Sequence, residues 1–86
     1  MRLFRWNEWN LDHATYHGVA VAEIESIVRR GPARQVGDNK YLVRGRGIGG
    51  RWVQVIYVIG ADELYYVIHA RPLSDREKWR LRRRLR

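Results

Sequence analysis

Three histidines are the side chains of this chain best suited to acid–base chemistry at neutral pH. His13 and His17 are four residues apart in an expected helix, so their rings would share one face. Two imidazoles make half of a metal site and the sequence fixes no third ligand nearby, so we expect no metal and no cofactor. Hydrogen bonding to helix-end carbonyls is the simpler interpretation of His17. Both histidines remain candidates for proton transfer.

The third histidine, His69, belongs to a predicted strand that ends in an arginine. Side chains alternate along a strand, so every second residue is expected on the same face. One face is predicted to hold Tyr65, Val67, His69 and Arg71, and the other, helix-covered face to hold Tyr66, Ile68 and Ala70.

Two arginines near this strand end could bind a phosphate. Arg76 follows Arg71 at the second position of an expected helix, where free N–H groups attract anions. Alternatively, Arg71 pairs with a carboxylate such as Glu77 or Glu8. The candidate catalytic residues are therefore His13, His17, His69, Arg71 and Arg76.

Positive charge is concentrated in the second half of the chain. The net charge is +8, with six basic and five acidic residues in 1–43 but eleven basic and four acidic in 44–86. Fifteen of the 17 basic residues are arginine, which binds phosphate through two parallel hydrogen bonds. This asymmetry predicts a nucleic acid or an acidic protein as partner, the alternative being a solvated basic surface.

Two basic segments are the expected RNA contacts. The glycine-rich stretch 44–51 is similar to RGG segments, although turn geometry alone also favours such glycines. The C-terminal helix carries consecutive arginines that could follow a phosphate backbone, dock an acidic protein segment or remain solvated. Trp6, Trp9 and Trp52 could stack on bases or lie in the core. The residues expected to bind RNA are Arg44, Arg46, Arg51, Arg80 and Arg83.

The elements that position these residues follow from hydrophobic periodicity. One α+β domain over residues 1–86 is expected, with an antiparallel sheet and helices packed on it. Glu23 and Glu25 are expected to face water on the second helix. The predicted order is strand Leu3–Trp6, helix Leu11–His17 capped by Asn10, helix Val21–Arg30, strands Ala33–Val36, Lys40–Arg44, Trp52–Ile59 and Leu64–Arg71, and helix Asp75–Arg84 with a capping box from Ser74 to Glu77.

Several classes of protein are excluded. The chain has no cysteine, so it has neither a disulfide nor a thiolate metal site. Its longest apolar run, Val55–Ile59, is far shorter than the ~20 residues of a membrane span, and no secretion signal is evident, so a cytoplasmic protein without a membrane partner is expected. RNA cleavage suits the remaining side chains, because the 2′-hydroxyl supplies the nucleophile.

Taken in order, the segments resemble the BrnT family of toxins over almost the whole chain. The likeness lies in Phe4, Trp6 and Asn10, then His17-Gly18-Val19, Glu23 and Glu25, the glycine-rich turn into a valine-rich strand at Gly47–Tyr57, the strand end Ile68, Ala70 and Arg71, and finally Arg76 and Glu77.

This resemblance implies a RelE-like fold and a metal-independent endoribonuclease that inhibits translation and growth. It also implies a cognate antitoxin with a ribbon-helix-helix DNA-binding part, two toxins assembling with two antitoxins, and operator DNA bound only through the antitoxin. By motif, it points to His17, Arg71 and Arg76 as functional residues. The alternatives from other classes are a non-catalytic nucleic-acid-binding module and a protein-interaction domain.

Overall fold

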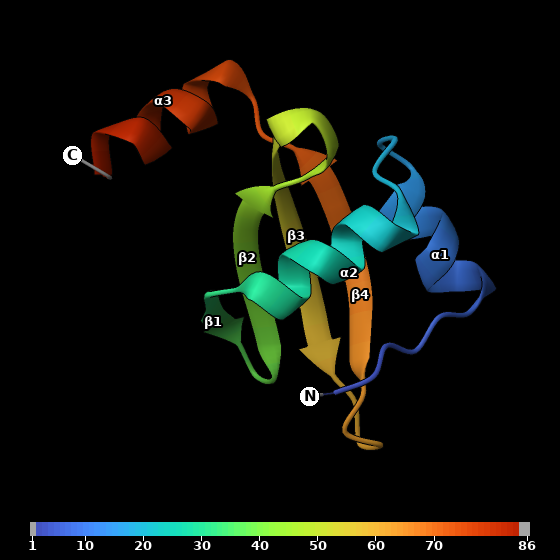
Figure 1. Ribbon diagram of the computed structural model, residues 1–86. Helices are drawn as coiled ribbons and strands as arrows, with labels where there is room; N and C mark the ends of the chain where they lie inside the picture. The colour runs from blue at the N-terminus through green and yellow to red at the C-terminus, as the bar shows by residue number, and fades with distance from the viewer. Residues whose placement is uncertain (1, 85–86) are drawn as a thin grey trace.

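A computed structural model of the protein describes residues 2–84. The expected α+β class and antiparallel sheet are confirmed: the four strands of the described chain lie in the order β1-β2-β3-β4, each antiparallel to its neighbour (Figure 1). The elements are α1 (Glu8–Thr15), α2 (Val21–Arg30), β1 (Ala33–Gly37), β2 (Lys40–Arg46), a short 3-10 turn (Ile48–Gly50), β3 (Trp52–Ile59), β4 (Tyr65–Pro72) and α3 (Asp75–Arg84).

The predicted first strand, Leu3–Trp6, is wrong. Only one parallel bridge forms there, between Phe4 and Tyr65. The chain leaves the sheet early because α1 begins at Glu8 rather than Leu11. Asn7, not Asn10, is the N-cap, and the two asparagines cap each other: the Asn10 N–H donates to Asn7 Oδ1 at 3.0 Å and the Asn7 N–H donates to Asn10 Oδ1 at 2.7 Å. This reciprocal box places both the cap and the helix start three residues earlier than predicted.

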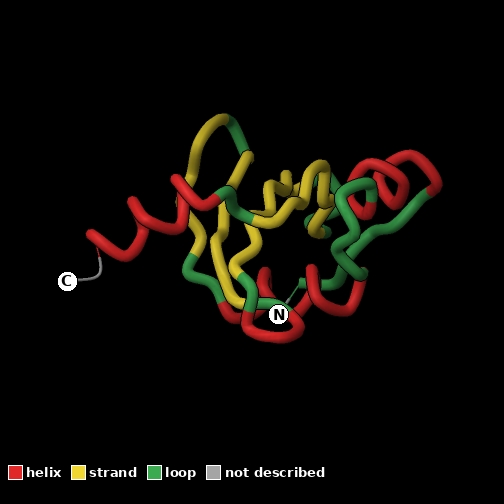
Figure 2. The backbone as a smooth tube through the Cα atoms, turned by 90° about the horizontal axis from the view of Figure 1, so that it is seen from above, coloured by secondary structure: helices red, strands yellow, loops and turns green. Residues whose placement is uncertain are grey.

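One face of the sheet is covered by α2 and the other is left open. α2 packs across one face and α1 lies beyond the β4 edge, while α3 projects away on the side opposite α1 (Figure 2). The core forms where Ile24 and Ile27 of α2 meet Val43, Val55 and Val67 of the sheet, all five almost fully buried. No helix of the described residues 2–84 lies across the other face, which is called the open face below.

A β-bulge in β4 decides which side chains reach the open face. The register shifts so that Ile56 pairs with His69 and Tyr57 with Val67, which leaves Ile68 without a partner. Val67 and Ala70 are therefore both fully buried although they are three residues apart. The prediction that Val67 and His69 share a face is wrong, because the unpaired Ile68 between them inverts the alternation. His69 and Arg71, which flank buried Ala70, are directed to the open face.

The glycine-rich loop is tied to α2 by a buried carboxylate. Contrary to expectation, Glu23 does not face water and is only 3% exposed. It accepts hydrogen bonds from the Ile48 N–H at 2.8 Å and from Arg51 Nε at 3.2 Å. A Cβ on Gly47 would lie 1.8 Å from the Glu23 carboxylate, so only glycine fits there. The glycines of this loop thus serve a close approach between loop and helix.

Gly47→Ala is expected to destabilise the protein by about 1–3 kcal/mol, because the added methyl group displaces Glu23 from its hydrogen bonds. Urea denaturation of the purified variant measures this loss. The matched control is Gly37→Ala, whose Cβ would meet the Lys40 side chain at an ordinary 3.5 Å. Equal stability of the two variants would contradict the role assigned to Gly47.

Candidate functional site

α1 and β4 bring two of the three histidines together. The ring centroids of His17 and His69 lie 5.8 Å apart, with the rings edge to face. His17 follows the end of α1, where Gly18 turns the chain with a φ of 80°. His69 reaches the same place because the β4 bulge turns it out of the core. Neither sequence spacing nor strand alternation predicted this pair.

The surroundings of His69 keep its imidazole unprotonated at neutral pH. Partial burial, the Arg71 guanidinium and the neighbouring His17 lower the pKa of His69 below its ordinary value of 6.5. An imidazole in this form carries a free lone pair and can accept a proton. His69 is therefore the stronger candidate for a general base.

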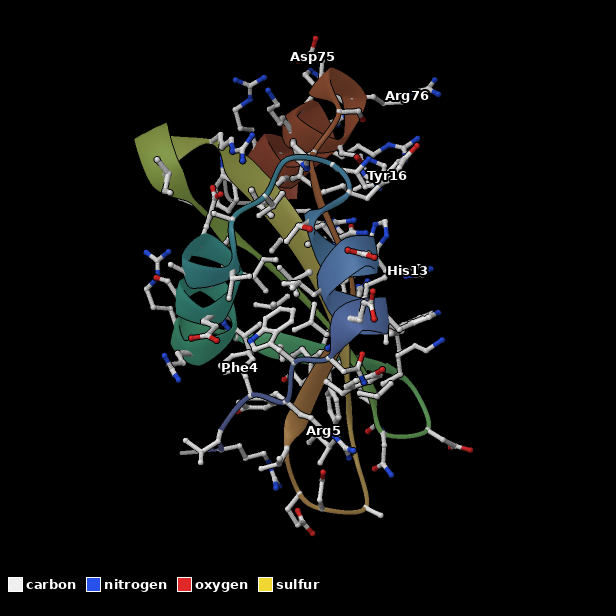
Figure 3. The ribbon with its side chains drawn as sticks, turned by 90° about the vertical axis from the view of Figure 1, so that its right-hand side faces the viewer. Phe4, Arg5, His13, Tyr16, Asp75 and Arg76 are labelled. Carbon is white, nitrogen blue, oxygen red and sulfur yellow. The ribbon has the colours of Figure 1, made fainter. Side chains whose placement is uncertain are left out.

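His13 has a different environment from the pair. Its Nδ1–H donates to the Trp9 carbonyl at 2.8 Å, and its ring stacks on the Trp9 indole at a centroid distance of 3.8 Å. The contact with a helix carbonyl that was expected for His17 is thus made by His13. The bond leaves the His13 Nε2 lone pair free. Figure 3 shows His13 and Tyr16 on the side of α1 that faces away from α2.

Basic side chains lie beside the histidine pair on the open face. The strand register places Arg44, Gln54 and Arg71 in one row across β2, β3 and β4. Arg44 donates to Gln54 Oε1 from Nε at 3.2 Å and from a terminal nitrogen at 3.1 Å. His69 occupies the neighbouring row. Guanidinium groups and proton-transfer groups therefore share one surface.

Arg71 is held by a carboxylate from the start of α3. Its two terminal nitrogens donate to the Glu77 oxygens at 2.6 and 2.7 Å. Glu77 also accepts from the Ser74 N–H at 2.9 Å and donates its own N–H to Ser74 Oγ at 3.2 Å, which confirms the predicted capping box. Of the two alternatives left open for Arg71, pairing with Glu77 is the one observed.

Arg76 does not join Arg71 in a ready phosphate seat. Its side chain is exposed, forms no hydrogen bond or ion pair within residues 2–84, and projects outward from the beginning of α3 (Figure 3). One guanidinium of the predicted pair is thus occupied by Glu77 and the other lies in solvent. Glu77 occupies one hydrogen of each terminal nitrogen of Arg71, so the Nε–H and the second hydrogen of one terminal nitrogen are the donors left for a phosphate.

Acid is expected to detach α3 from the sheet. No residue of α3 is buried within the described chain, so the helix depends on the Arg71–Glu77 pair and the Ser74 cap. The Arg71 guanidinium and the Ser74 N–H hold the pKa of Glu77 far below its ordinary value of 4.5. A lowered folded-state pKa means that this stabilisation is complete above the unfolded value and is lost as pH falls below it.

Amide exchange of residues 75–84 measures this effect, with protection expected to fall as the pH is lowered below about 4.5. Glu77→Gln is expected to show weak protection already at neutral pH and little further change in acid. Protection of α3 that does not depend on pH in the unmodified protein would contradict this prediction.

The predicted RNA-binding arginines divide into two groups. Arg44, Arg46 and Arg80 line two adjoining grooves of about 620 and 160 Å³ beside the open face. Arg51 instead pairs with buried Glu23, and Arg83 lies over the Trp79 ring at 4.9 Å. Further groove residues were not predicted from the sequence: Arg30, Arg34, Leu42, Leu81 and Arg84. Strand alternation could have revealed Arg34 and Leu42, and the helical repeat of α3 could have revealed Leu81 and Arg84.

The tryptophans also divide by environment. Trp6 is half-buried and donates from Nε1 to Glu25 at 2.8 Å, so Glu25 too has a structural contact. Trp52 lies under the Arg46 guanidinium at 4.7 Å on the groove wall. Trp9 is 52% exposed. Trp79 is 53% exposed because α3 projects from the fold.

Within residues 2–84, no three histidine, cysteine, aspartate or glutamate side chains cluster closely enough to hold a metal ion. A search of the same residues found no helix with the length and apolar character needed to cross a membrane. Comparison of the chain with protein-family models, curated proteins and solved structures finds no match in any of the three.

Proposed function

We propose that the protein is a metal-independent endoribonuclease that cleaves RNA at the His17–His69 pair. The observation that carries the proposal is the 5.8 Å separation of these rings beside the row of Arg44, Gln54 and Arg71 on the open face. Two imidazoles at this distance can serve the two oxygens that exchange protons during phosphodiester cleavage. Neighbouring guanidinium groups offer the positive charge that the transition state requires.

The chemistry needs no group beyond this chain and its substrate. His69, unprotonated at neutral pH, removes the proton of the ribose 2′-hydroxyl, and the 2′-oxygen forms a bond to phosphorus. The bond from phosphorus to the 5′-oxygen breaks, and His17 donates the proton that this oxygen takes up. Arg71, held by Glu77, stabilises the growing negative charge of the phosphate through the N–H donors that Glu77 leaves free. The products are a 2′,3′-cyclic phosphate and a 5′-hydroxyl.

In the cell, we propose that this activity makes the protein a RelE-like toxin of the BrnT type, acting in the cytoplasm to inhibit translation and growth. The proposed partners are a cognate antitoxin with a ribbon-helix-helix part, assembled as two toxins with two antitoxins, and operator DNA reached only through the antitoxin. The support is the order of motifs along the chain and the basic grooves beside the open face, which offer an acidic segment or an RNA backbone several guanidinium groups.

A second candidate function is RNA binding without cleavage. The observation that favours it is the bidentate pair of Arg71 with Glu77, whereas Arg44 and the other groove arginines form no ion pair within residues 2–84. Such a module binds RNA with an affinity that falls steeply as salt rises, and it leaves the RNA intact.

Incubation of the purified protein with RNA, with and without EDTA, separates the two functions. The nuclease proposal expects new 5′-hydroxyl ends and 2′,3′-cyclic phosphate ends in equal amounts under both conditions. Expression in bacteria without an antitoxin gene is expected to stop growth. Intact RNA at protein concentrations that saturate binding would reject the nuclease in favour of the binding module.

A further inference from the structure

A pocket of about 240 Å³ adjoins the histidine pair between α1 and the outer edge of β4. The cleavage chemistry proposed above uses His17 and His69 from its lining. It leaves four other lining residues without a role, namely Asp12, His13, Tyr16 and Ile68. These four have the chemical character of a site for a flat, hydrogen-bonding ring.

The walls of the pocket are aromatic or apolar. The His13 ring is held in place by stacking on Trp9 at 3.8 Å and by its bond to the Trp9 carbonyl at 2.8 Å. Tyr16 stands edge-on to His17 at 5.0 Å and is 81% exposed, so its ring is free to cover a ligand. Ile68, the unpaired residue of the β4 bulge, adds an apolar surface. Rings and apolar surfaces of this kind bind nucleobases by stacking, whatever the base.

Asp12 gives the pocket a polar, selective edge. Its side chain forms no hydrogen bond or ion pair with any other residue of the described range 2–84. An ionised carboxylate only accepts hydrogen bonds, and its two oxygens can accept two parallel N–H donors. Guanine presents two adjacent donors, N1–H and the N2 amino group, on its Watson–Crick edge. Uracil offers one N–H between two carbonyl oxygens, and adenine and cytosine each offer an amino group beside an acceptor that repels a carboxylate.

We propose that this pocket binds guanine, with Asp12 accepting from its N1–H and N2 amino group and with Tyr16 and His13 stacking on it. The inference rests on the proposed nuclease function for its biological meaning. A guanine seated here places its own ribose, and hence the 2′-hydroxyl and the 3′-phosphate, next to His69 and His17. The enzyme then cleaves on the 3′ side of guanosine.

Nucleotide binding tests the pocket without requiring catalysis. The 3′-monophosphates of guanosine, inosine, adenosine, cytidine and uridine are titrated into the purified protein and followed by calorimetry, with inorganic phosphate as the base-free probe. Guanosine is expected to bind about 10-fold or more tighter than adenosine, cytidine and uridine, and inosine, which lacks the N2 amino group, to bind with intermediate affinity. Equal affinity for all five nucleotides, binding no tighter than inorganic phosphate, or no binding at all would overturn the proposal.

Two variants on α1 form a matched pair. Asp12→Asn is expected to weaken the binding of guanosine 3′-monophosphate by about 10- to 100-fold and to abolish the preference among bases, because the charge-assisted hydrogen bonds are lost. Glu8→Gln removes a carboxylate of the same helix that does not line the pocket, and its preference is expected to match that of the unmodified protein. Tyr16→Ala is expected to weaken the binding of all five nucleotides by the same factor. Retained guanosine preference in Asp12→Asn would overturn the role of Asp12.

The same measurements separate the pocket from the nuclease. If the protein prefers guanosine but does not cut RNA, the guanine-binding proposal stands and the nuclease proposal is overturned. If RNA is cleaved at an equal rate after every base, and Asp12→Asn does not change this rate, the nuclease proposal stands and the guanine-binding proposal is overturned.

Discussion

His69→Ala and His17→Ala are each expected to slow RNA cleavage by about 10²- to 10⁴-fold, the contribution of a positioned proton-transfer group. The first variant loses the base that accepts the 2′-hydroxyl proton, and the second loses the acid that protonates the leaving oxygen. Single-turnover cleavage of a labelled RNA at saturating protein measures the chemical step for both variants. RNA binding is expected to change little, because the arginines of the open face and the grooves remain.

The double variant gives a sharper result than either single variant. Groups that act in one step have non-additive effects, so His17→Ala with His69→Ala is expected to be about as slow as the slower single variant. Lys40→Ala, an exposed change on β2 at a distance from the pocket, serves as the control and is expected to cleave at the unmodified rate. Unchanged cleavage in His69→Ala with an intact fold would remove this residue from the chemistry.

Glu23→Ala is expected to lower the free energy of unfolding by about 2–3 kcal/mol, which corresponds to a fall in Tm of roughly 10–20 °C for a domain of this size. The Glu23 side chain is 1% exposed. Its loss leaves the Ile48 N–H without its acceptor and the Arg51 guanidinium with only the Gly18 carbonyl, and it frees the glycine-rich loop from α2. Thermal unfolding monitored by circular dichroism provides the measurement.

The acid dependence of stability offers a second readout of the same residue. Hydrogen bonds from Arg51 are the largest cause that lowers the pKa of Glu23 from its ordinary value of 4.5. Its contribution is therefore complete above that value and is lost as pH falls below it, so Glu23→Ala is expected to flatten this part of the stability profile. Glu25→Ala, which removes a less buried carboxylate from the same helix, is the control and is expected to lower the Tm by less. A Tm of Glu23→Ala equal to that of the unmodified protein would contradict the account.

Much of the fold could be predicted from local sequence signals. The bounds of α2, β3 and α3 agree with the prediction because each has a strong periodic pattern between clear stop signals, such as Gly31-Pro32 after α2. The N-terminal helix was misplaced because two asparagines three residues apart both suit an N-cap, and only their reciprocal bonding selects Asn7. The β4 bulge was missed because one unpaired residue does not visibly change the hydrophobic pattern of the strand sequence.

The candidate site could be predicted only in part. Residue type was enough to select His17, His69 and Arg71, but their mutual arrangement depends on contacts between distant segments. Strict alternation correctly placed His69 and Arg71 opposite helix-covered Ala70, but the bulge moved Val67 to the buried face, so this predicted neighbour of His69 was wrong. The burial of Glu23 was also hidden, since its position on α2 is that of a solvent-facing residue until the glycine-rich loop folds over it.

The pH dependence of single-turnover RNA cleavage tests the histidine pair most directly. The rate is expected to fall in acid with a limb that lies below pH 6.5, because the pKa of His69 is lowered by burial, by Arg71 and by His17. The acid limb is expected to vanish in His69→Ala. A profile that keeps its acid limb in His69→Ala would contradict the proposal that His69 accepts the proton of the 2′-hydroxyl.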